Sequence, residues 1–251
     1  MLVLLPPSET KALGGDGGAL DLSALSHPSL NPAREVVVGA LEELARDVPA
    51  SLRVLGLSER QAGEVERNVG LRVSATLPAL ARYTGVLYDA LERTGFTKVE
   101  AARAGARLHV ASALFGLVGG GDPIPAYRLS GGSVIPSVGS LGALWRPVLE
   151  PVLREVDEFV VDLRSSPYNS LAKVPDAVVV KVVTDGEGGK RQAVSHFNKA
   201  HKGRLARALV KTRAEVDSVR KLVAVAGKAG LRLEPTGTHE VELVVAGNGV
   251  G

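Results

Sequence analysis

The sequence contains no cysteine and few aromatic residues, and each shortage removes a class of chemistry. Its 251 residues include one Met and one Trp, and the aromatic content is only 4%. Without Cys the protein has no thiolate nucleophile, no disulfide and no Cys-ligated zinc or iron–sulfur site. The apolar residues form only short runs such as Ala177 to Val180, whereas roughly 20 in a row are needed to span a bilayer. We therefore expect a cytoplasmic protein with no membrane partner.

Helix and strand patterns mix along the chain without regular alternation. Helical apolar spacing is found at residues 32–46, 77–93, 140–156 and 215–229. Patterns typical of strands are found at 1–5, 108–117, 158–163, 177–183, 231–234 and 240–245, and residues 181–194 resemble a hairpin turning at Asp185-Gly186. Because a strict βαβ repeat is missing, the patterns predict an irregular mixed α/β (α+β) fold rather than a Rossmann fold or a TIM barrel. The length fits a single domain over residues 1–251.

Positive charge is concentrated in one segment. The formal charge of the whole chain is only +3, but residues 190–232 contain twelve Lys or Arg against two acidic residues, Glu215 and Asp217. Within this segment, Asn198 is a candidate N-cap of a helix, and no acidic residue lies between Lys190 and Ala214. The ion pairs between successive turns that a merely solvated helix usually has are therefore missing.

A helical projection of this segment separates apolar from basic residues. The side expected to face the core carries His201, Leu205, Ala208, Leu209 and Thr212. The flanks carry the candidate DNA contacts Lys199, Lys202, Arg204, Arg207 and Lys211. The pattern favours a phosphate-binding face over the alternative, a solvated helix surface.

Residues 48–69 have the pattern of two short helices joined by a tight turn. Gly56 permits the turn, Leu57 is positioned to pack between the helices, and Ser58 begins the second helix. The pattern resembles the helix-hairpin-helix of DNA-binding and repair proteins, whose hairpin amides hold a phosphate without reading sequence, although Ser58 stands where that motif usually has a second Gly. The candidate DNA contacts here are Arg53, Gly56, Leu57, Ser58 and Arg60. The alternative is an ordinary helix pair, which the acidic residues Glu59, Glu64 and Glu66 favour.

No pattern predicts a cofactor or a metal. The glycines between Gly14 and Gly18 lack the spacing of a phosphate-binding loop, and no Gly-Lys-Ser or Gly-Lys-Thr follows them. Neither a Gly-x-Ser-x-Gly motif nor another hydrolase template is visible. Of the five His residues only His196 and His201 lie close together, and at that spacing they would not face one ligand. We therefore expect no metal site and no bound cofactor.

Several short motifs follow one another over the whole chain. The first is an apolar strand that ends in Pro6-Pro7-Ser8-Glu9-Thr10-Lys11, and the second is Tyr83-Thr84-Gly85-Val86-Leu87-Tyr88. The others are Leu114-Phe115-Gly116-Leu117 with Ala126-Tyr127-Arg128-Leu129, Leu144-Trp145, Asp162-Leu163-Arg164-Ser165-Ser166-Pro167-Tyr168, and Lys199-Ala200-His201-Lys202-Gly203-Arg204-Leu205-Ala206-Arg207. Together and in this order they resemble the YaaA family of bacterial peroxide stress proteins.

The resemblance carries expectations of its own. It implies a cytoplasmic protein that binds DNA, helps cells to survive hydrogen peroxide and limits free intracellular iron, in a fold particular to the family that includes a helix-hairpin-helix. Three positions depart from the family motifs. Glu9 stands where many members have Lys, and Lys11 lies two positions later. Pro167 replaces an acidic residue, and Lys202 replaces an Arg. The chain is therefore expected to be a divergent member.

The same motifs contain polar residues that form a cationic pocket if they converge in space. These candidates are Ser8, Glu9, Lys11, Tyr83, Thr84, Tyr127, Arg128, Arg164, Ser165 and Tyr168. Tyr faces stack on bases and cations hold phosphates, so the leading interpretation is binding of duplex or distorted DNA without sequence preference.

Three alternatives to this interpretation remain open. One is an enzyme acting on a nucleic-acid base or a nucleotide-like small molecule, with Lys11, Tyr127, Arg128 and Lys199 as candidate catalytic residues. Another is that the polar residues only tie loops to the core by hydrogen bonds. The third is a scaffold whose basic face binds an acidic protein.

Overall fold

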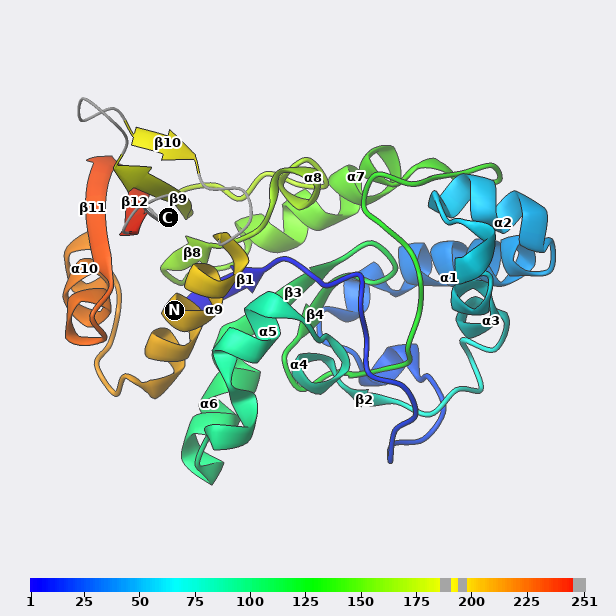
Figure 1. Cartoon of the computed structure of the whole chain (residues 1–251), viewed down its shortest axis with the longest axis horizontal. Helices are drawn as coiled ribbons and strands as arrows, with labels where there is room; N and C mark the ends of the chain where they lie inside the picture. Colours follow the sequence, from blue (N-terminus) through cyan, green and yellow to red (C-terminus); the bar gives the residue numbers. More distant parts are fainter. Residues whose placement is uncertain (186–190, 194–197, 246–251) are drawn as a thin grey trace.

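The computed structural model describes residues 1–185, 191–193 and 198–245, and one eight-stranded sheet runs through it (Figure 1). Along the sheet the strands follow the order β11 (Arg232–Gly237), β12 (Glu240–Val245), β9 (Val178–Asp185), β8 (Val160–Asp162), β1 (Leu2–Leu5), β3 (Leu108–Ser112) and β4 (Gly116–Gly119), and β10 (Arg191–Ala193) pairs with β9. From β12 to β3 neighbouring strands are parallel, whereas β4, β10 and β11 are antiparallel to their partners. The predicted mixed α/β fold is therefore confirmed.

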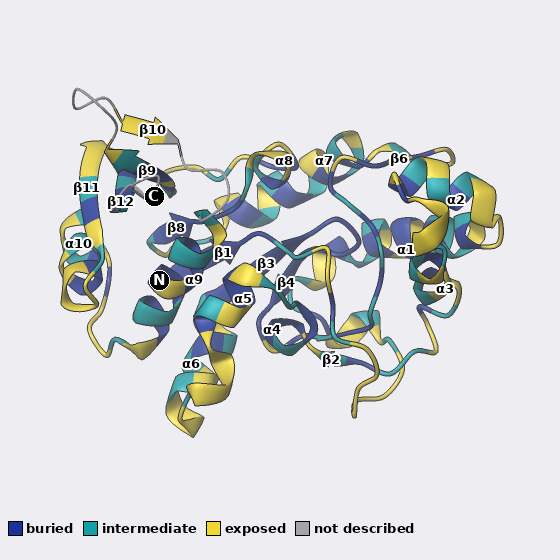
Figure 2. Cartoon of the chain, viewed as in Figure 1, coloured by how far each residue is buried: buried dark blue, intermediate teal, exposed yellow. Residues whose placement is uncertain are grey.

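The first strand of the chain is a central strand of the sheet. In β1, Val3 pairs with Leu108 of β3 on one side and with Val161 of β8 on the other. All four residues of β1 are buried, as is typical of a parallel strand covered on both faces (Figure 2). Against the sheet, α6 (Lys98–Arg107) packs on β1 and β3, α9 (Asn198–Lys211) on β9, and α7 (Leu141–Arg154) on β4.

Several predicted helices are present with nearly the expected bounds. They are α1 (Asn31–Ala45), α7, and α10 (Val219–Lys228). In α7 the Ser140 side chain accepts a hydrogen bond from the Ala143 amide at the N-terminus, and the fully buried Trp145 donates to the Ala113 carbonyl. In the described ranges, no helix combines the length and the hydropathy needed to cross a membrane.

The helix predicted over residues 77–93 is interrupted. The structure has β2 (Leu77–Pro78), α4 (Ala79–Arg82) and α5 (Val86–Leu91) instead, and β2 pairs with β5 (Pro123–Ile124). Between the two helices, Tyr83 forms an isolated β-bridge with Lys11, and Gly85 has a φ of +92°, which residues with a Cβ rarely adopt. The apolar spacing was compatible with one helix, but the contact with the loop after β1 breaks it.

The region compared with a helix-hairpin-helix consists of two short helices. α2 (Val48–Leu55) ends at Gly56, which has a left-handed backbone, and a 3₁₀ turn (Glu59–Gln61) leads into α3 (Gly63–Val69). Leu57 is buried, and the amide and hydroxyl of Ser58 both donate to the side-chain oxygen of Gln61. The helix pair and its Gly turn are thus present, while its use as a DNA-binding hairpin stays a prediction.

The buried face of the basic helix α9 is displaced from the one that the projection predicted, since His201, Ala208 and Thr212 are only half-buried. Leu205 and Leu209 are buried as expected, but Lys202, Ala206 and Val210 are buried as well. The cause is packing on two sides, since α9 lies against β9 and also against α5. The expected position of Lys202 on an exposed flank is therefore wrong.

The remaining α-helix and strands are short. They are α8 (Ser166–Asn169) and the strand pair β6 (Val134–Ile135) and β7 (Gly139–Ser140). The antiparallel pairing of β9 with β10 fits the predicted hairpin, but its turn at residues 186–190 lies outside the described residues.

Candidate functional site

A polar centre lies where the strand order of the sheet reverses. After β1 the chain continues to β3 on one side of that strand and later returns to β8 on its other side. In open α/β sheets, ligands bind at the carboxyl ends of the strands at such a switch point. The segments that leave these ends are the loop Pro6 to Lys11 after β1, Ser112 at the end of β3, and Asp162 to Ser165 at the end of β8.

Lys11 is the buried cation of this centre. Its ammonium donates to the Ser8 carbonyl at 2.9 Å and lies 4.1 Å from the centroid of the Tyr127 ring and 5.4 Å from that of Tyr83. Burial lowers the pKa of Lys11 from 10.5 to about 7, and the carboxylate of Glu9 only partly opposes this. A substantial fraction of this amine is therefore uncharged at neutral pH.

Three hydroxyl groups beside Lys11 are linked by hydrogen bonds. The hydroxyls of Tyr83 and Tyr127 are 2.8 Å apart, and the Tyr127 hydroxyl is 2.9 Å from Ser112 Oγ. Burial raises the pKa of Tyr83 to about 12 and the pKa of Tyr127 well above 10, so both phenols remain protonated at neutral pH. Since Ser112 Oγ also accepts from the Phe115 amide, the chain of hydroxyls is fixed to the backbone at one end.

An ion pair borders the centre on its exposed side. Arg128 and Glu9 are 3.2 Å apart, with side chains 17% and 45% exposed. The backbone of Arg128 is held by the buried Asn68 of α3, whose amide group donates to the Arg128 carbonyl and accepts from its N–H. The helix pair α2–α3 is thereby fixed beside the polar centre.

Other predicted pocket residues are engaged in holding the structure together. The buried Arg164 forms an ion pair with Asp162 and donates to the carbonyls of Tyr168 and Ala172. The ammonium of Lys202 donates to the Arg164 carbonyl, and burial lowers the pKa of Lys202 to about 8. The Tyr168 hydroxyl accepts from the Gly131 amide. These contacts match the alternative in which such residues tie loops to the core.

The remaining candidates differ in their contacts. The hydroxyls of Ser8 and Thr10 are 3.1 Å apart, and the Thr10 hydroxyl donates to the Thr84 carbonyl, which joins two pocket segments. Ser165 precedes α8 and is half-buried. Lys199 is exposed in the first turn of α9.

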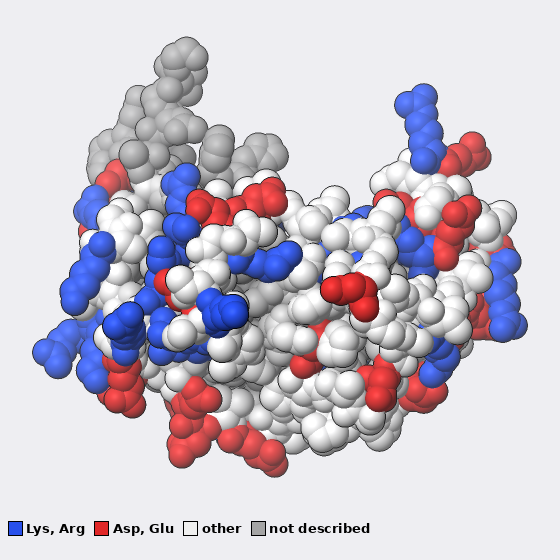
Figure 3. Space-filling model, turned by 90° about the horizontal axis from the view of Figure 1, so that it is seen from below, with Lys and Arg blue, Asp and Glu red and all other residues white. Residues whose placement is uncertain are grey.

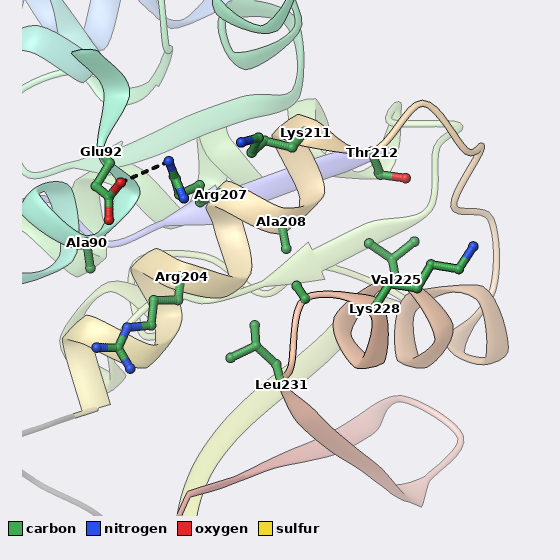
Figure 4. Close-up of a pocket in the computed structure, with 11 residues that line it drawn as sticks. Ala90, Glu92, Arg204, Arg207, Ala208, Lys211, Thr212, Val225, Lys228 and Leu231 are labelled. Atoms are coloured by element: carbon green, nitrogen blue, oxygen red, sulfur yellow. Dashed lines mark ion pairs between the residues drawn. The ribbon is translucent and has the colours of Figure 1, made fainter. Parts of the chain in front are cut away.

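The cations of α9 line a groove rather than a projecting ridge. Arg204, Arg207 and Lys211 share a cavity of about 570 Å³ with Lys228 of α10 (Figure 4). Arg207 also pairs with Glu92 at 2.9 Å. Lys228 lies in the basic segment noted in the sequence. Its proximity to Arg204, Arg207 and Lys211 could not be predicted, because α9 and α10 come together only through the fold.

The two ends of the molecule differ in charge. Figure 3 shows Lys and Arg gathered at the end that carries α9 and α10, a hollow in the middle, and both signs of charge at the end that carries α2 and α3. Arg53 in the last turn of α2 is exposed, as are Gly56, Ser58 and Arg60 in the turn between α2 and α3, whereas Leu57 is buried. Glu59 in the same turn and Glu66 in α3 are exposed too, so this region carries carboxylates as well as cations.

Residues of the types that can bind metals are scattered over the part of the chain that the structure describes. Those residues contain no group of three or more His, Asp and Glu that could hold a metal ion. His196, one of the two His residues close in sequence, lies outside the described residues.

The fold and the polar centre define an α/β protein whose candidate site lies at the switch point of a mostly parallel sheet. The family model described as "Peroxide stress protein YaaA" matches residues 1–236. The chain belongs to this family, and the resemblance seen in its motifs is confirmed. The family name places the chain among proteins of the peroxide and oxidative stress response.

Relatives of nearly the same length share two fifths of the sequence or more. A UPF0246 protein of Corynebacterium glutamicum is 43% identical over 249 residues, 98% of this chain and 99% of that protein. A UPF0246 protein of Corynebacterium efficiens is 44% identical over 238 residues, 93% of this chain and 95% of the relative. One of Streptomyces coelicolor is 43% identical over 239 residues, 93% and 92% respectively.

Some residues of the polar centre were missed by sequence analysis. Ser112 ends the chain of hydroxyls and Asp162 is the partner of Arg164, but neither was named as a site residue. Both are the last residues of parallel strands, and this position was the available signal.

Proposed function

We propose that this member of the peroxide stress family binds DNA through its phosphates and without sequence preference. The observation that carries the proposal is α9, which has no acidic residue along its length and presents Lys199, Arg204 and Lys211 as exposed cations. Phosphate contacts of this kind supply affinity and positioning but carry no sequence information. DNA covered in this way is shielded from iron-dependent oxidative damage, and the proposal places the protein in the cytoplasm with the bacterial DNA.

The turn between α2 and α3 is the second proposed contact. The first amides of a helix lack partners within that helix, so those of Glu59 and Arg60 are available to a phosphate, whereas that of Gln61 donates to the Ser58 carbonyl. The exposed Glu59 and Glu66 repel the same phosphate, which weakens this contact relative to α9. We therefore expect α9 to supply most of the affinity.

The test is fluorescence anisotropy with labelled duplex, single-stranded and bubble-containing DNA at two salt concentrations. With about four phosphate contacts, affinity should fall roughly a hundredfold between 50 and 200 mM salt. The double variant Arg204→Glu with Lys211→Glu should weaken binding to all sequences alike. Lys173→Glu is the matched control, since Lys173 is exposed and lies away from both contacts on the connection between α8 and β9. A flat salt response, or equal loss in the control, would refute the proposal.

A second candidate function is chemistry on a nucleic-acid base or nucleotide. The observation that favours it is Lys11, an amine whose pKa is lowered to about 7 and which lies over the rings of Tyr83 and Tyr127. An uncharged amine can serve as a base or a nucleophile, and a cation such as Arg128 can stabilise developing negative charge. Incubation with DNA and nucleotides, followed by mass spectrometry of protein and nucleosides, tests this function. Finding neither an adduct on Lys11 nor an altered nucleoside would count against it.

A further inference from the structure

The groove between α9 and α10 has a composition unlike that of a simple DNA-contacting surface. One wall comes from α9, the other from α10 and the connection between α10 and β11, and the end of α5 borders it (Figure 4). Its volume of about 570 Å³ lies in the range of small-molecule sites. A duplex presents its phosphates on a convex surface, so this recess suits a small ligand better.

The charge in the groove is strongly positive. Four cationic side chains line it, Arg204, Arg207, Lys211 and Lys228, against one carboxylate, Glu92. Glu92 is paired with Arg207 through one guanidinium nitrogen, while the Nε of Arg207 is buried without a hydrogen-bond partner in the described part of the chain. A net charge of about three remains for a ligand to neutralise, and one buried N–H group lacks an acceptor.

The helix dipole of α9 does not oppose an anion here. The C-terminal carbonyls of a helix carry partial negative charge that repels an anion. In this protein Arg103 of α6 donates to the carbonyls of Val210 and Lys211, and Arg107 donates to those of Leu209 and Thr212. The two arginines therefore offset the negative end of α9 beside Lys211.

Apart from Thr212, the rest of the groove is apolar. Ala90, Ala208, Val225, Ala229 and Leu231 line it, and Figure 4 shows Val225 and Leu231 on the side opposite Ala208. Inorganic phosphate has no group that would cover this surface. A ligand that fills the groove therefore combines phosphate groups with an organic body.

We propose that the groove binds a small organic diphosphate of the nucleoside diphosphate class. Two adjacent phosphates carry about three negative charges at neutral pH, which matches the surplus of cations, and the nucleoside covers the apolar wall. Binding of this ligand does not depend on DNA binding. Because Arg204 and Lys211 would serve both, the ligand should also compete with DNA.

The first test is isothermal titration calorimetry of the full chain with ADP, inorganic pyrophosphate and adenosine. ADP should bind in a saturable manner, pyrophosphate should bind at least tenfold more weakly, and adenosine should give no heat of binding. Absence of ADP binding at millimolar concentration would overturn the proposal. Pyrophosphate binding as tightly as ADP would overturn it as well, because the apolar wall would then contribute nothing.

Variants separate this site from the proposed DNA contacts. Lys228→Glu should lower the affinity for ADP at least tenfold and the affinity for duplex DNA by a smaller factor, because Lys228 lines the groove but is not one of the proposed DNA contacts. Arg220→Glu makes the same charge change on the exposed surface of α10 outside the groove and should alter neither. Ala208→Phe, which fills the groove from the half-buried wall of α9, should abolish ADP binding.

The two proposals fail in different ways. Loss of DNA binding with ADP binding intact would refute only the DNA proposal. If Lys228→Glu and Ala208→Phe remain folded by circular dichroism and bind ADP as the parent does, the groove is not the site and the inference is overturned.

Discussion

The ammonium group of Lys11 lies 4.1 Å from the centroid of the Tyr127 ring, so a cation is buried against the face of a phenol. The Tyr face and the Ser8 carbonyl favour the charged amine, while burial opposes it. Burial outweighs both contacts, and the pKa of Lys11 is lowered to about 7. The centre thus holds an amine that gains and loses its proton near neutral pH.

Replacing Lys11 with Met should change how stability depends on pH. Between pH 7 and 10.5 the unfolded chain binds a proton that the folded chain has released, so the free energy of unfolding rises with pH across this window. In Lys11→Met this contribution is missing. The difference in free energy of unfolding between the two proteins should therefore change by a few kcal/mol across this window, on the order of 1.4 kcal/mol per pKa unit. Urea denaturation of both proteins at neutral and alkaline pH measures it. Parallel pH profiles would contradict the assignment.

Acidification should destabilise the protein through a pair of histidines. The rings of His27 and His109 have centroids 5.3 Å apart, and burial and the neighbouring His27 lower the pKa of His109 from 6.5 to about 4. The unfolded chain therefore takes up protons that the folded chain does not, and stability falls as the pH drops from about 6.5 to about 4. His109→Leu should reduce this fall in thermal unfolding curves, whereas His239→Leu, at an exposed position, should not.

The contact between α9 and α5 depends on Gly203. A Cβ at this position would lie 2.2 Å from the Leu87 carbonyl oxygen and 2.9 Å from the Cβ of Ala90. Gly203→Ala should therefore destabilise the fold by roughly 1–3 kcal/mol, because the helices must move apart. Gly39→Ala is the control within α1, where a Cβ meets nothing within 4 Å, and it should stabilise by about 0.5–1 kcal/mol. Thermal or urea unfolding compares them, and equal effects would refute the close approach.

Arg164 should matter for stability and not for DNA affinity. Arg164→Met leaves the buried carboxylate of Asp162 without its cation, which typically costs roughly 3–5 kcal/mol. The double variant Asp162→Leu with Arg164→Met removes both charges and should recover part of the loss. A double-mutant cycle of urea denaturation measures this coupling. If Arg164→Met instead lowers DNA affinity with stability unchanged, Arg164 belongs to the binding site.

Sequence patterns predicted the elements whose apolar residues match the burial that their place in the fold requires. The helix α1 has apolar residues at helical spacing, and the strand β1 is a continuous apolar run, as a strand buried on both faces requires. The interruption at Tyr83 to Gly85 was not predictable from periodicity, because its cause is a bridge to Lys11 from a distant segment.

The sequence predicted the residue types of the candidate site better than it predicted which of these residues lie together in the fold. The motifs named Lys11, Tyr83, Tyr127 and Arg128, which the fold brings together. They also named Lys202 as a surface cation, yet its ammonium points inward to the Arg164 carbonyl. Residue type alone cannot separate these cases, because a Lys side chain is long enough to reach either solvent or a buried carbonyl.

The central place of β1 has a consequence for the growing polypeptide. Val3 leaves the ribosome before both of its partners, Leu108 and Val161, which are far along the chain. Both edges of this apolar strand are therefore unpaired until β3 is made, and one edge is unpaired until β8 is made. The sheet closes by long-range pairing, which is slow and exposes aggregation-prone surface. Protection of this segment during translation is thus a requirement that the topology itself imposes on the cell.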